Sequence, residues 1–238
     1  MKPRILTDSE VVYALLTNAI VVTPLLSKSQ VGATLDLRLG TEFVVKKMDR
    51  LTHIDPIWFN QLERSDPEVM VRFYETVKLV DPTTAFVLHP GQFALGCTLE
   101  YIDLPPQIGG MLEGRSSWAR EGLNVHSTAG LIHPGHKGVI VFELLNAGSH
   151  PIPLYPGIRV AQLLLYELDS VTRQPYGLRD DSKYSRYVAT NFGRPWADWE
   201  FECLGQKSRR RPAELKREEQ HPGESERAQP EQGRSETS

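Results

Sequence analysis

The clearest strand pattern in the sequence reads Gly138-Val139-Ile140-Val141-Phe142-Glu143-Leu144-Leu145-Asn146. β-branched and aromatic residues favour strands, and this apolar run fits a strand in the core of a sheet. Further runs of the same type, separated by Gly and Pro, occur at residues 34–39, 86–89, 93–102 and 159–168. Many short strands with turn residues between them indicate a mainly β fold, either a barrel or a sandwich.

Glu143 is the only charged residue in this apolar run. A buried carboxylate is unfavourable unless a partner stabilises its charge, and Arg120 is the candidate partner. The pair could be purely structural, because ion pairs inside a sheet resemble active sites. Two serines and a second arginine lie beside Arg120, in the stretch Gly114-Arg115-Ser116-Ser117-Trp118-Ala119-Arg120. Together these residues indicate a site for a polyanion and for proton transfer.

Length and charge limit the class of protein. The chain has 238 residues, of which 40% are hydrophobic, enough for one substantial core or one core plus a tail. Its formal net charge is −3 and its pI is about 6.2, so it lacks the basic field that nucleic-acid binding requires. Any anion site must therefore be local, and a small phosphate-bearing ligand is expected rather than nucleic acid.

The cysteines and the N-terminus bear on the compartment. Cys97 and Cys203 are far apart and have no CxxC partner, so neither a disulfide framework nor a cysteine zinc site is expected. The N-terminus lacks the features of a signal peptide, and no run approaches the length of a bilayer span. We expect a soluble protein of the reducing cytoplasm with no membrane partner.

The sequence predicts a helix near the N-terminus and a disordered tail at the C-terminus. The pattern Thr7-Asp8-Ser9-Glu10 is typical of a capping box, and apolar residues then follow at helical spacing, so a short N-terminal helix is predicted. Residues 205–238 contain only Ala213, Leu215 and Ala228 as apolar residues and no aromatic residue. We predict one domain over residues 1–204 and a disordered charged tail over 205–238. The basic cluster at 209–211 could bind an acidic partner, but a solvated tail is the favoured interpretation.

Residues 46–80 are ambiguous. A helix could begin at Asp66-Pro67 and extend through Lys78, but the apolar residues Val69, Val71 and Phe73 also alternate as in a strand. The segment is left unassigned and is interpreted as an insertion or lid.

Several stretches, taken in order, resemble the dCTP deaminase family of the dUTPase-like superfamily. They are Phe86-Val87-Leu88-His89-Pro90-Gly91, Gly114 to Arg120, His126-Ser127-Thr128-Ala129-Gly130, His133-Pro134-Gly135 and Glu143. The resemblance implies a distorted jelly roll or β-barrel that assembles as a homotrimer, with active sites at the subunit interfaces. It also implies hydrolysis of dCTP to dUTP and ammonia, with Mg²⁺ carried by the triphosphate and no cofactor held by the protein.

The resemblance implies a mechanism without a protein-bound metal. Zinc deaminases of nucleobases carry an H-x-E and P-C-x-x-C set, which this sequence lacks. In the implied mechanism the Ser116 hydroxyl and the Ala129 carbonyl hold a water against C4 of cytosine. Glu143 takes the proton of that water, passes it to ring nitrogen N3 and later protonates the departing amine. Arg120 orients Glu143 and stabilises its charge.

The predicted substrate-binding residues surround this centre. Arg115 and Ser117 suit phosphate oxygens, and the resemblance adds Tyr176 and Lys183, which alone would be interpreted as surface residues. The set is completed by Trp118, Ala119, Val141 and Phe142, of which Trp118 is interpreted as packing. His126 is interpreted as a packed histidine bonded to backbone, and Gln162 as a residue that supports the fold.

Two departures from the family pattern affect the expected product. His133 replaces an aspartate that contacts the sugar 3′-hydroxyl, and Tyr187 replaces a glutamine; the tyrosine could stack on the ligand or cap the site. An imidazole beside a triphosphate tends to be cationic and is then a poor base, so dUTP is expected rather than dUMP. Two alternatives remain open. One is a bifunctional enzyme that yields dUMP, because residues 126–130 resemble the bifunctional members; the other is a non-catalytic, nucleotide-binding regulatory trimer.

Overall fold

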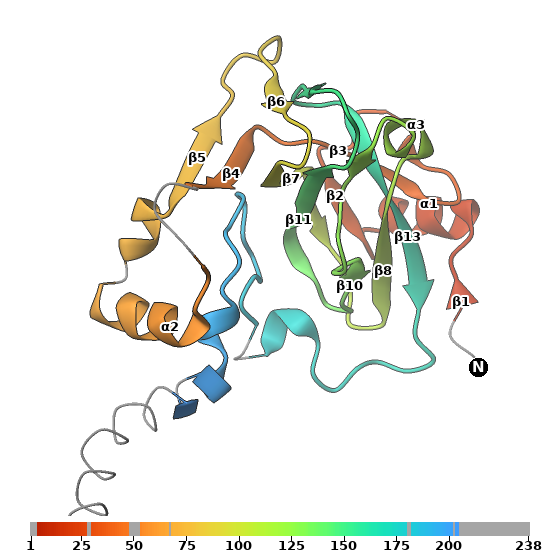
Figure 1. The fold of residues 1–238 in the computed structure, drawn as a ribbon. Coiled ribbons are helices and arrows are strands. Elements are labelled where there is room, and N and C mark those ends of the chain that lie inside the picture. The colour runs from red at the N-terminus through yellow and green to blue at the C-terminus, as the bar shows by residue number, and fades with distance from the viewer. Residues whose placement is uncertain are drawn as a thin grey trace, which may run out of the picture. The chain divides into compact units, whose positions relative to one another are not determined.

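The computed structural model describes residues 4–204, apart from 28–29, 48–52, 67, 180–181 and 202 (Figure 1). The predicted tail, 205–238, lies outside the described residues. The chain divides into two compact units, the larger formed by the described residues within 1–52 and 70–193, the smaller by those within 53–69 and 194–238. The single deaminase domain over 1–204 stays a prediction. No helix in the described part of the chain is long and apolar enough to cross a membrane.

The predicted N-terminal helix is confirmed as α1, Asp8–Leu16. The Thr7 hydroxyl accepts a hydrogen bond from the Glu10 N–H, and the Glu10 carboxylate accepts one from the Thr7 N–H at 2.9 Å. This reciprocal pair is the predicted capping box, and it satisfies two N–H groups that have no partner within the helix.

The larger unit is built from antiparallel sheets, which confirms the predicted mainly β fold. Among the described residues, a five-stranded sheet contains β1 (Arg4–Ile5), β3 (Leu35–Arg38), β8 (Ile108–Gly114), β10 (Leu131–Ile132) and β13 (Arg159–Glu167). A six-stranded sheet contains β2 (Val21–Thr23), β4 (Glu42–Lys46), β5 (Tyr74–Lys78), β7 (Phe93–Asp103), β9 (Leu123–Asn124) and β11 (Lys137–Asn146). A two-stranded sheet pairs β6 (Phe86–Leu88) with β12 (Ile152–Leu154).

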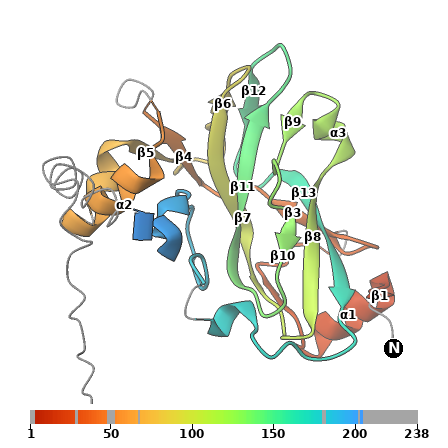
Figure 2. The ribbon, with the colours of Figure 1, turned by 60° about the horizontal axis from the view of Figure 1, so that its bottom comes forward.

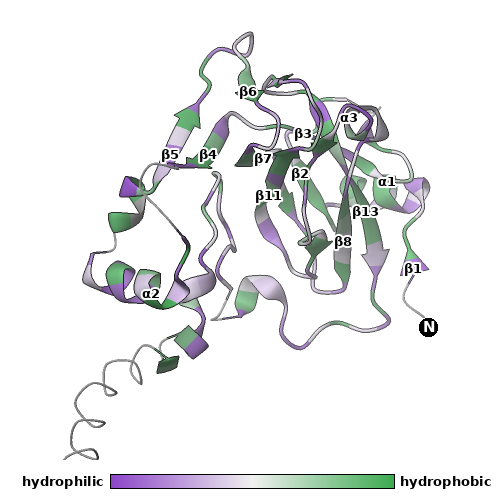
Figure 3. Ribbon diagram, viewed as in Figure 1, coloured by the Kyte–Doolittle hydropathy of each residue, from purple (hydrophilic) through white to green (hydrophobic). Residues whose placement is uncertain are grey.

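The strands predicted from the sequence are β3, β6, β7, β11 and β13, in agreement with the expected runs. One hydrophobic core cluster contains side chains of all three sheets. Figure 2 shows the sheet of β7 and β11 beside the sheet of β8 and β13, and Figure 3 shows hydrophobic residues along β8 and β11. The core is therefore the layer between the sheets of the larger unit.

The alternation of side chains along β11 decides where Glu143 points. Phe142 and Leu144 are 0% exposed and belong to the core cluster. Because successive side chains of a strand point to opposite faces, Glu143 lies on the other face with Val141. Glu143 is half-buried there. The expectation that apolar neighbours bury this carboxylate in the core is wrong.

The ambiguous segment 46–80 forms several elements. Helix α2 is Pro56–Ser65, and the Asp55 carboxylate caps it by accepting the N–H of Ile57 at 2.9 Å. A short 3₁₀ helix, η3 (Val69–Arg72), and strand β5 follow. The alternative that a helix opens at Asp66 is wrong, because Asp66 is the residue that ends α2. The role of the segment as a lid stays a prediction.

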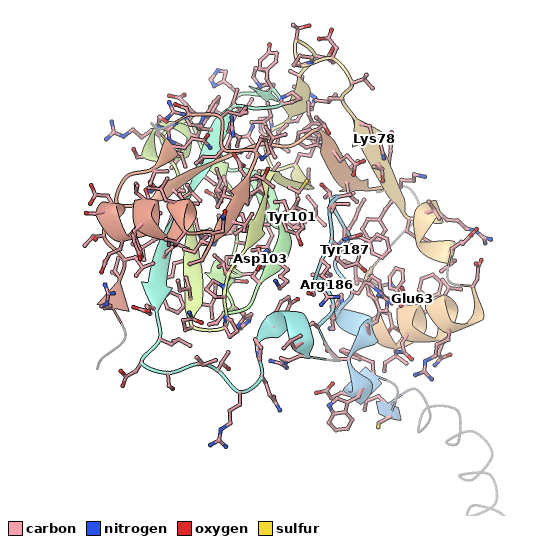
Figure 4. The ribbon with its side chains drawn as sticks, turned by 180° about the vertical axis from the view of Figure 1, so that it is seen from behind. Glu63, Lys78, Tyr101, Asp103, Arg186 and Tyr187 are labelled. Atoms are coloured by element: carbon pink, nitrogen blue, oxygen red, sulfur yellow. The ribbon has the colours of Figure 1, made fainter. Side chains whose placement is uncertain are left out.

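The smaller unit is held together by aromatic stacking and by Glu63 of α2. The rings of Phe59 and Trp196 stack with centroids 4.8 Å apart, where Trp196 belongs to the 3₁₀ helix η5 (Pro195–Ala197). The Glu63 carboxylate, labelled in Figure 4, accepts hydrogen bonds from Arg194 Nε and Trp196 Nε1, both at 3.0 Å. A buried stack with a paired carboxylate explains why these two short segments form a compact unit.

Candidate active site

A cavity of about 330 Å³ lies beside β11 in the larger unit. A volume of this size is typical of small-molecule sites, and the lining is largely apolar with a few polar groups. The lining residues are Leu95, Ala129, Leu131, Ile132, His133, His136, Val139, Ile140, Val141, Glu143, Tyr176, Tyr184, Tyr187, Asn191, Phe192 and Gly193. We call it the Glu143 cavity.

Glu143 is fixed from two directions by the segment that follows β9. Its backbone N–H donates to the Val125 carbonyl at 2.9 Å, and its carboxylate oxygen Oε2 accepts the Ser127 N–H at 2.7 Å. The second oxygen, Oε1, accepts no hydrogen bond from the described residues. A carboxylate oriented in this way beside an apolar cavity can accept a proton from a bound molecule and return it.

An irregularity in β11 lies next to the cavity. The pairing of β11 with β7 shifts between Val139 and Val141. The Ile140 N–H donates to the buried Thr98 hydroxyl at 3.0 Å, and that hydroxyl donates to the Glu100 carbonyl at 2.6 Å. Bulges of this kind redirect side chains near functional sites, and here the shift occurs in the strand that carries Glu143.

Three rings form one wall of the cavity. Tyr176, in the 3₁₀ helix η4 (Tyr176–Leu178), stacks on His133 with centroids 5.6 Å apart and on His136 at 6.4 Å. His136 Nε2 lies 3.2 Å from the Gly138 carbonyl. Burial lowers the pKa of His136, so its imidazole is neutral at neutral pH. The predicted residues Tyr176 and His133 thus meet at the cavity, together with a histidine that was not predicted.

Residues 186–187 run along the edge of β11. The Val139 N–H donates to the Tyr187 carbonyl at 2.9 Å, and the Arg186 N–H donates to the Lys137 carbonyl at 2.6 Å. Figure 4 shows Arg186 and Tyr187 near Asp103, whose carboxylate accepts from Lys137 Nζ at 2.8 Å. Tyr187 also lines the Glu143 cavity, and its predicted role in binding the substrate stays a prediction.

Two glycines allow this close approach. Gly135 has φ of +80°, and a Cβ there would lie 2.5 Å from Cβ of Pro175. Gly138 has φ of +138°, and a Cβ there would lie 2.8 Å from the Tyr187 carbonyl oxygen. Any other residue at either position would strain the backbone and push the segment after β13 away from the cavity.

Asn191 is a cavity residue that sequence reasoning missed. Its side-chain nitrogen is buried and has no hydrogen-bond partner among the described residues. The residues on either side are fixed, because the Thr190 hydroxyl donates to the Glu42 carbonyl at 2.9 Å and Phe192 stacks on Tyr74 with centroids 4.9 Å apart. No local pattern in the sequence marks this asparagine, because its position depends on contacts with β4 and β5.

The predicted residues of the 114–120 stretch do not join Glu143 within one chain. Helix α3 is Ser116–Ala119, and Ser116, Ser117, Ala119 and Arg120 are all exposed. None of them lines the Glu143 cavity, and no ion pair between described residues joins Arg120 to Glu143. Arg115 and Trp118 instead line a second cavity. The catalytic roles of Ser116 and Arg120 stay predictions.

The other predicted residues are distributed as follows. Ala129 and Val141 line the Glu143 cavity, whereas the Phe142 side chain is in the core and can face a ligand only through its backbone. Lys183 is half-buried in the segment between η4 and Tyr187.

Gln162 and His126 were both interpreted as structural residues, and the structure agrees with the details of that interpretation only for Gln162. Gln162 bridges strands, donating to the Gly114 carbonyl at 3.5 Å and accepting from the Thr34 hydroxyl at 3.3 Å, which agrees with a role in the fold. The backbone bond predicted for His126 is absent among the described residues. Its Nδ1 is buried without a partner, and its Nε2 lies 3.7 Å from a Glu113 carboxylate oxygen.

Within the described ranges, no group of three or more His, Cys, Asp or Glu side chains is arranged to hold a metal ion. The expectation that Mg²⁺ is carried by the substrate triphosphate stays a prediction.

Comparisons with known proteins agree with one another. The dCTP deaminase-like family matches residues 5–168. The chain is 36% identical over 199 residues to the dCTP deaminase of Halorubrum lacusprofundi, covering 83% of this chain and 94% of that protein. It is 41% identical over 175 residues to a protein of Nocardia farcinica named dCTP deaminase, dUMP-forming, covering 73% of this chain and 81% of that protein.

A solved structure supports the fold. The crystal structure of 2′-deoxycytidine 5′-triphosphate deaminase from Agrobacterium tumefaciens is similar with a TM-score of 0.53 and 20% sequence identity. The similarity covers 73% of this chain and 51% of that one, so the chain spans about half the length of the solved protein.

Proposed function

Because the chain belongs to the dCTP deaminase-like family, we propose that it hydrolyses dCTP to dUTP and ammonia. The observation that supports this most directly is the Glu143 carboxylate, which is exposed to a small, largely apolar cavity and held by the Ser127 N–H at 2.7 Å. A fixed carboxylate with one uncommitted oxygen suits repeated proton transfer to and from a planar base.

The reaction adds water and removes ammonia at the same carbon. Water, held by the Ser116 hydroxyl and the Ala129 carbonyl, attacks C4 of the cytosine while Glu143 takes its proton. Glu143 passes this proton to N3, which gives a tetrahedral intermediate. It then carries the remaining hydroxyl proton to the amine, which leaves as ammonia while the C4 carbonyl forms. Arg120 pairs with Glu143 and favours its ionised form at the start of each cycle.

A homotrimer reconciles this mechanism with the positions of the residues. Ser116 and Arg120 are exposed on α3 and do not line the Glu143 cavity of their own chain. In a ring of three subunits, α3 of one subunit can face the Glu143 cavity of the next, since head-to-tail interfaces around a threefold axis close upon themselves. Each active site then contains Glu143 from one subunit and Ser116 with Arg120 from its neighbour.

The substrate triphosphate, with its Mg²⁺, binds Arg115 and Ser117 from the α3 side and Tyr176 and Lys183 from the cavity side. Guanidinium, hydroxyl and ammonium groups suit phosphate oxygens, and the metal neutralises part of the charge of the nucleotide. Tyr187, whose backbone is fixed against β11, lies where it can cover the bound nucleotide.

The product is dUTP because His133 replaces the aspartate that helps to activate water at the α-phosphate in the pyrophosphatase members. A second candidate is a bifunctional enzyme that releases dUMP, and the Nocardia farcinica relative, named dUMP-forming, favours it. Ion-exchange separation of the products at full conversion distinguishes the two. Accumulation of dUTP with one equivalent of ammonia supports the first proposal, whereas dUMP and pyrophosphate as main products would replace it with the second.

We place the enzyme in the cytoplasm. Both cysteines are free thiols, Cys97 buried and Cys203 exposed, which suits a reducing compartment.

A further inference from the structure

Asp36, on β3, holds two arginines at once. Arg159 Nη1 lies 2.9 Å from Asp36 Oδ2, and Arg115 Nε lies 3.5 Å from Asp36 Oδ1. The Asp36 side chain is 16% exposed, whereas those of Arg115 and Arg159 are 31% and 39% exposed. One largely covered carboxylate therefore faces two accessible guanidinium groups, and one positive charge remains uncompensated.

The ion pair between Arg38 and Glu100 does not neutralise the excess positive charge of Arg115 and Arg159. Arg38 Nε donates to Glu100 Oε1 at 2.7 Å, and the two side chains are 9% and 0% exposed. Glu100 also accepts the Arg38 backbone N–H at 3.0 Å and the Gln30 amide at 3.1 Å. Because both oxygens of Glu100 are occupied, this carboxylate neutralises Arg38 alone.

The three arginines, but not Asp36 or Glu100, line a second cavity of about 500 Å³, which is separate from the Glu143 cavity. Its lining includes Gln30, Arg38, Arg115, Trp118 and Arg159. Three arginines and the two carboxylates that pair with them leave a net charge of +1 around the cavity. An open cavity with a net positive charge and several N–H donors suits an oxyanion.

The backbone holds Arg159 next to Arg115. The Arg159 carbonyl accepts the Trp118 indole N–H at 3.0 Å and the Arg115 guanidinium at 3.5 Å. The Arg115 backbone N–H donates to the Val160 carbonyl at 3.0 Å. The start of β13 is thus tied to the start of α3, so the two guanidinium groups are positioned before any ligand binds.

We infer that Arg159 is a second arginine for the substrate triphosphate, acting beside Arg115 with Asp36 orienting both. The inference rests on the proposed function, which places the triphosphate at Arg115, and it assigns a role to a residue that the sequence did not mark. A guanidinium that shares one carboxylate with a second arginine keeps N–H groups for another acceptor. Phosphate oxygens can therefore bind it, since the planar guanidinium of Arg donates to two acceptors at once.

The test compares Arg159→Met with Arg4→Met in the full chain. Arg4 is a matched control, because it also joins two carboxylates, Glu10 at 2.6 Å and Glu167 at 3.0 Å, but lines neither cavity. We expect Arg159→Met to raise KM for dCTP by about ten- to hundredfold with kcat within about threefold. Arg159→Lys should be intermediate, because it keeps the charge but not the fork. Arg4→Met should leave both constants unchanged.

Inorganic tripolyphosphate supplies a readout that does not need turnover. By calorimetry the wild-type protein should bind it, Arg159→Met should bind it at least about tenfold more weakly, and it should inhibit competitively against dCTP. Equal binding by both proteins, an unchanged KM, or inhibition that is not competitive would overturn the inference. If dCTP is not deaminated at all, the proposed function fails, while the calorimetric comparison still decides whether Arg159 binds phosphates.

Discussion

Replacing Glu143 with glutamine should remove the proposed proton shuttle while keeping the shape of the side chain. In the native protein Glu143 Oε2 accepts the Ser127 N–H at 2.7 Å. The amide oxygen of glutamine can accept the same hydrogen bond. The exchange turns a charge-assisted bond into a neutral one, which lowers the free energy of unfolding by about 1 kcal/mol. The variant should therefore fold and bind dCTP.

The effect on the rate is much larger. A general acid–base group contributes about 10²- to 10⁴-fold, and the proposed mechanism gives Glu143 several proton transfers, so we expect the upper part of this range. A loss of 10⁴-fold corresponds to about 5 kcal/mol of transition-state stabilisation, at about 1.4 kcal/mol for each tenfold.

Single-turnover ammonia release, with enzyme in excess over dCTP, measures this loss without interference from product release. Equilibrium binding of dCTP, followed by calorimetry, separates chemistry from affinity. A rate within tenfold of the wild type would refute the assignment of Glu143 as the shuttle. An equal loss of binding and rate would show instead that the residue only holds the substrate.

The remaining predictions concern the surroundings of the site. Burial lowers the pKa of His136 below the value of about 6.5 that it has in the unfolded chain, so the unfolded state binds the proton more readily. The free energy of unfolding should therefore fall as pH drops below about 6.5, until the lower pKa of the folded state is reached. His136→Phe should flatten that part of a plot of Tm against pH, and identical slopes would contradict the reasoning. Glu100→Ala leaves buried Arg38 without its partner and should lower the free energy of unfolding by about 3–5 kcal/mol in chemical denaturation, whereas a change below about 1 kcal/mol would be inconsistent with a buried pair. A zinc-selective chelator should leave the rate unchanged and removal of Mg²⁺ should weaken dCTP binding, because the proposal assigns the metal to the triphosphate and not to the protein; stoichiometric zinc whose removal stops the reaction would contradict this.

The sequence was most informative where local chemistry determines structure. Thr7 and Glu10 specify the cap of α1 between themselves, and β-branched residues bounded by Gly and Pro specify strands such as β11. Strand β8 was not predicted, because Gly109 and Gly110 have no side chains to show an alternating pattern. These glycines let β8 lie close to the side chains of its neighbour β13, since a Cβ on Gly109 would lie 2.4 Å from the Tyr166 ring. Tyr166 is far away in the sequence, so nothing local marks this contact.

In the candidate site, too, the sequence revealed what local chemistry determines but not what depends on distant contacts. Glu143 could be identified as the exceptional residue of its strand, but the face on which it lies depends on the register of β11 against β7. Asn191 and Arg159 reach their cavities through contacts with β3, β4 and β5, which no local pattern reveals. The absence of α3 residues from the lining of the Glu143 cavity is likewise a property of the folded chain, and it leads to the proposal of a shared site.

Complementation between two inactive variants tests that proposal most directly. Glu143→Gln and Arg120→Ala, each alone, should release almost no ammonia from dCTP. When the two are co-expressed with different tags and the mixed trimers are purified, some sites pair an intact Glu143 with an intact Arg120 from the neighbouring subunit. Every mixed trimer of a head-to-tail ring contains one such site among its three, so the purified mixed trimers should recover about one third of wild-type activity. Recovery to about that level would support a deaminase whose active site is shared between subunits. No recovery, with each variant still folded and trimeric, would contradict it.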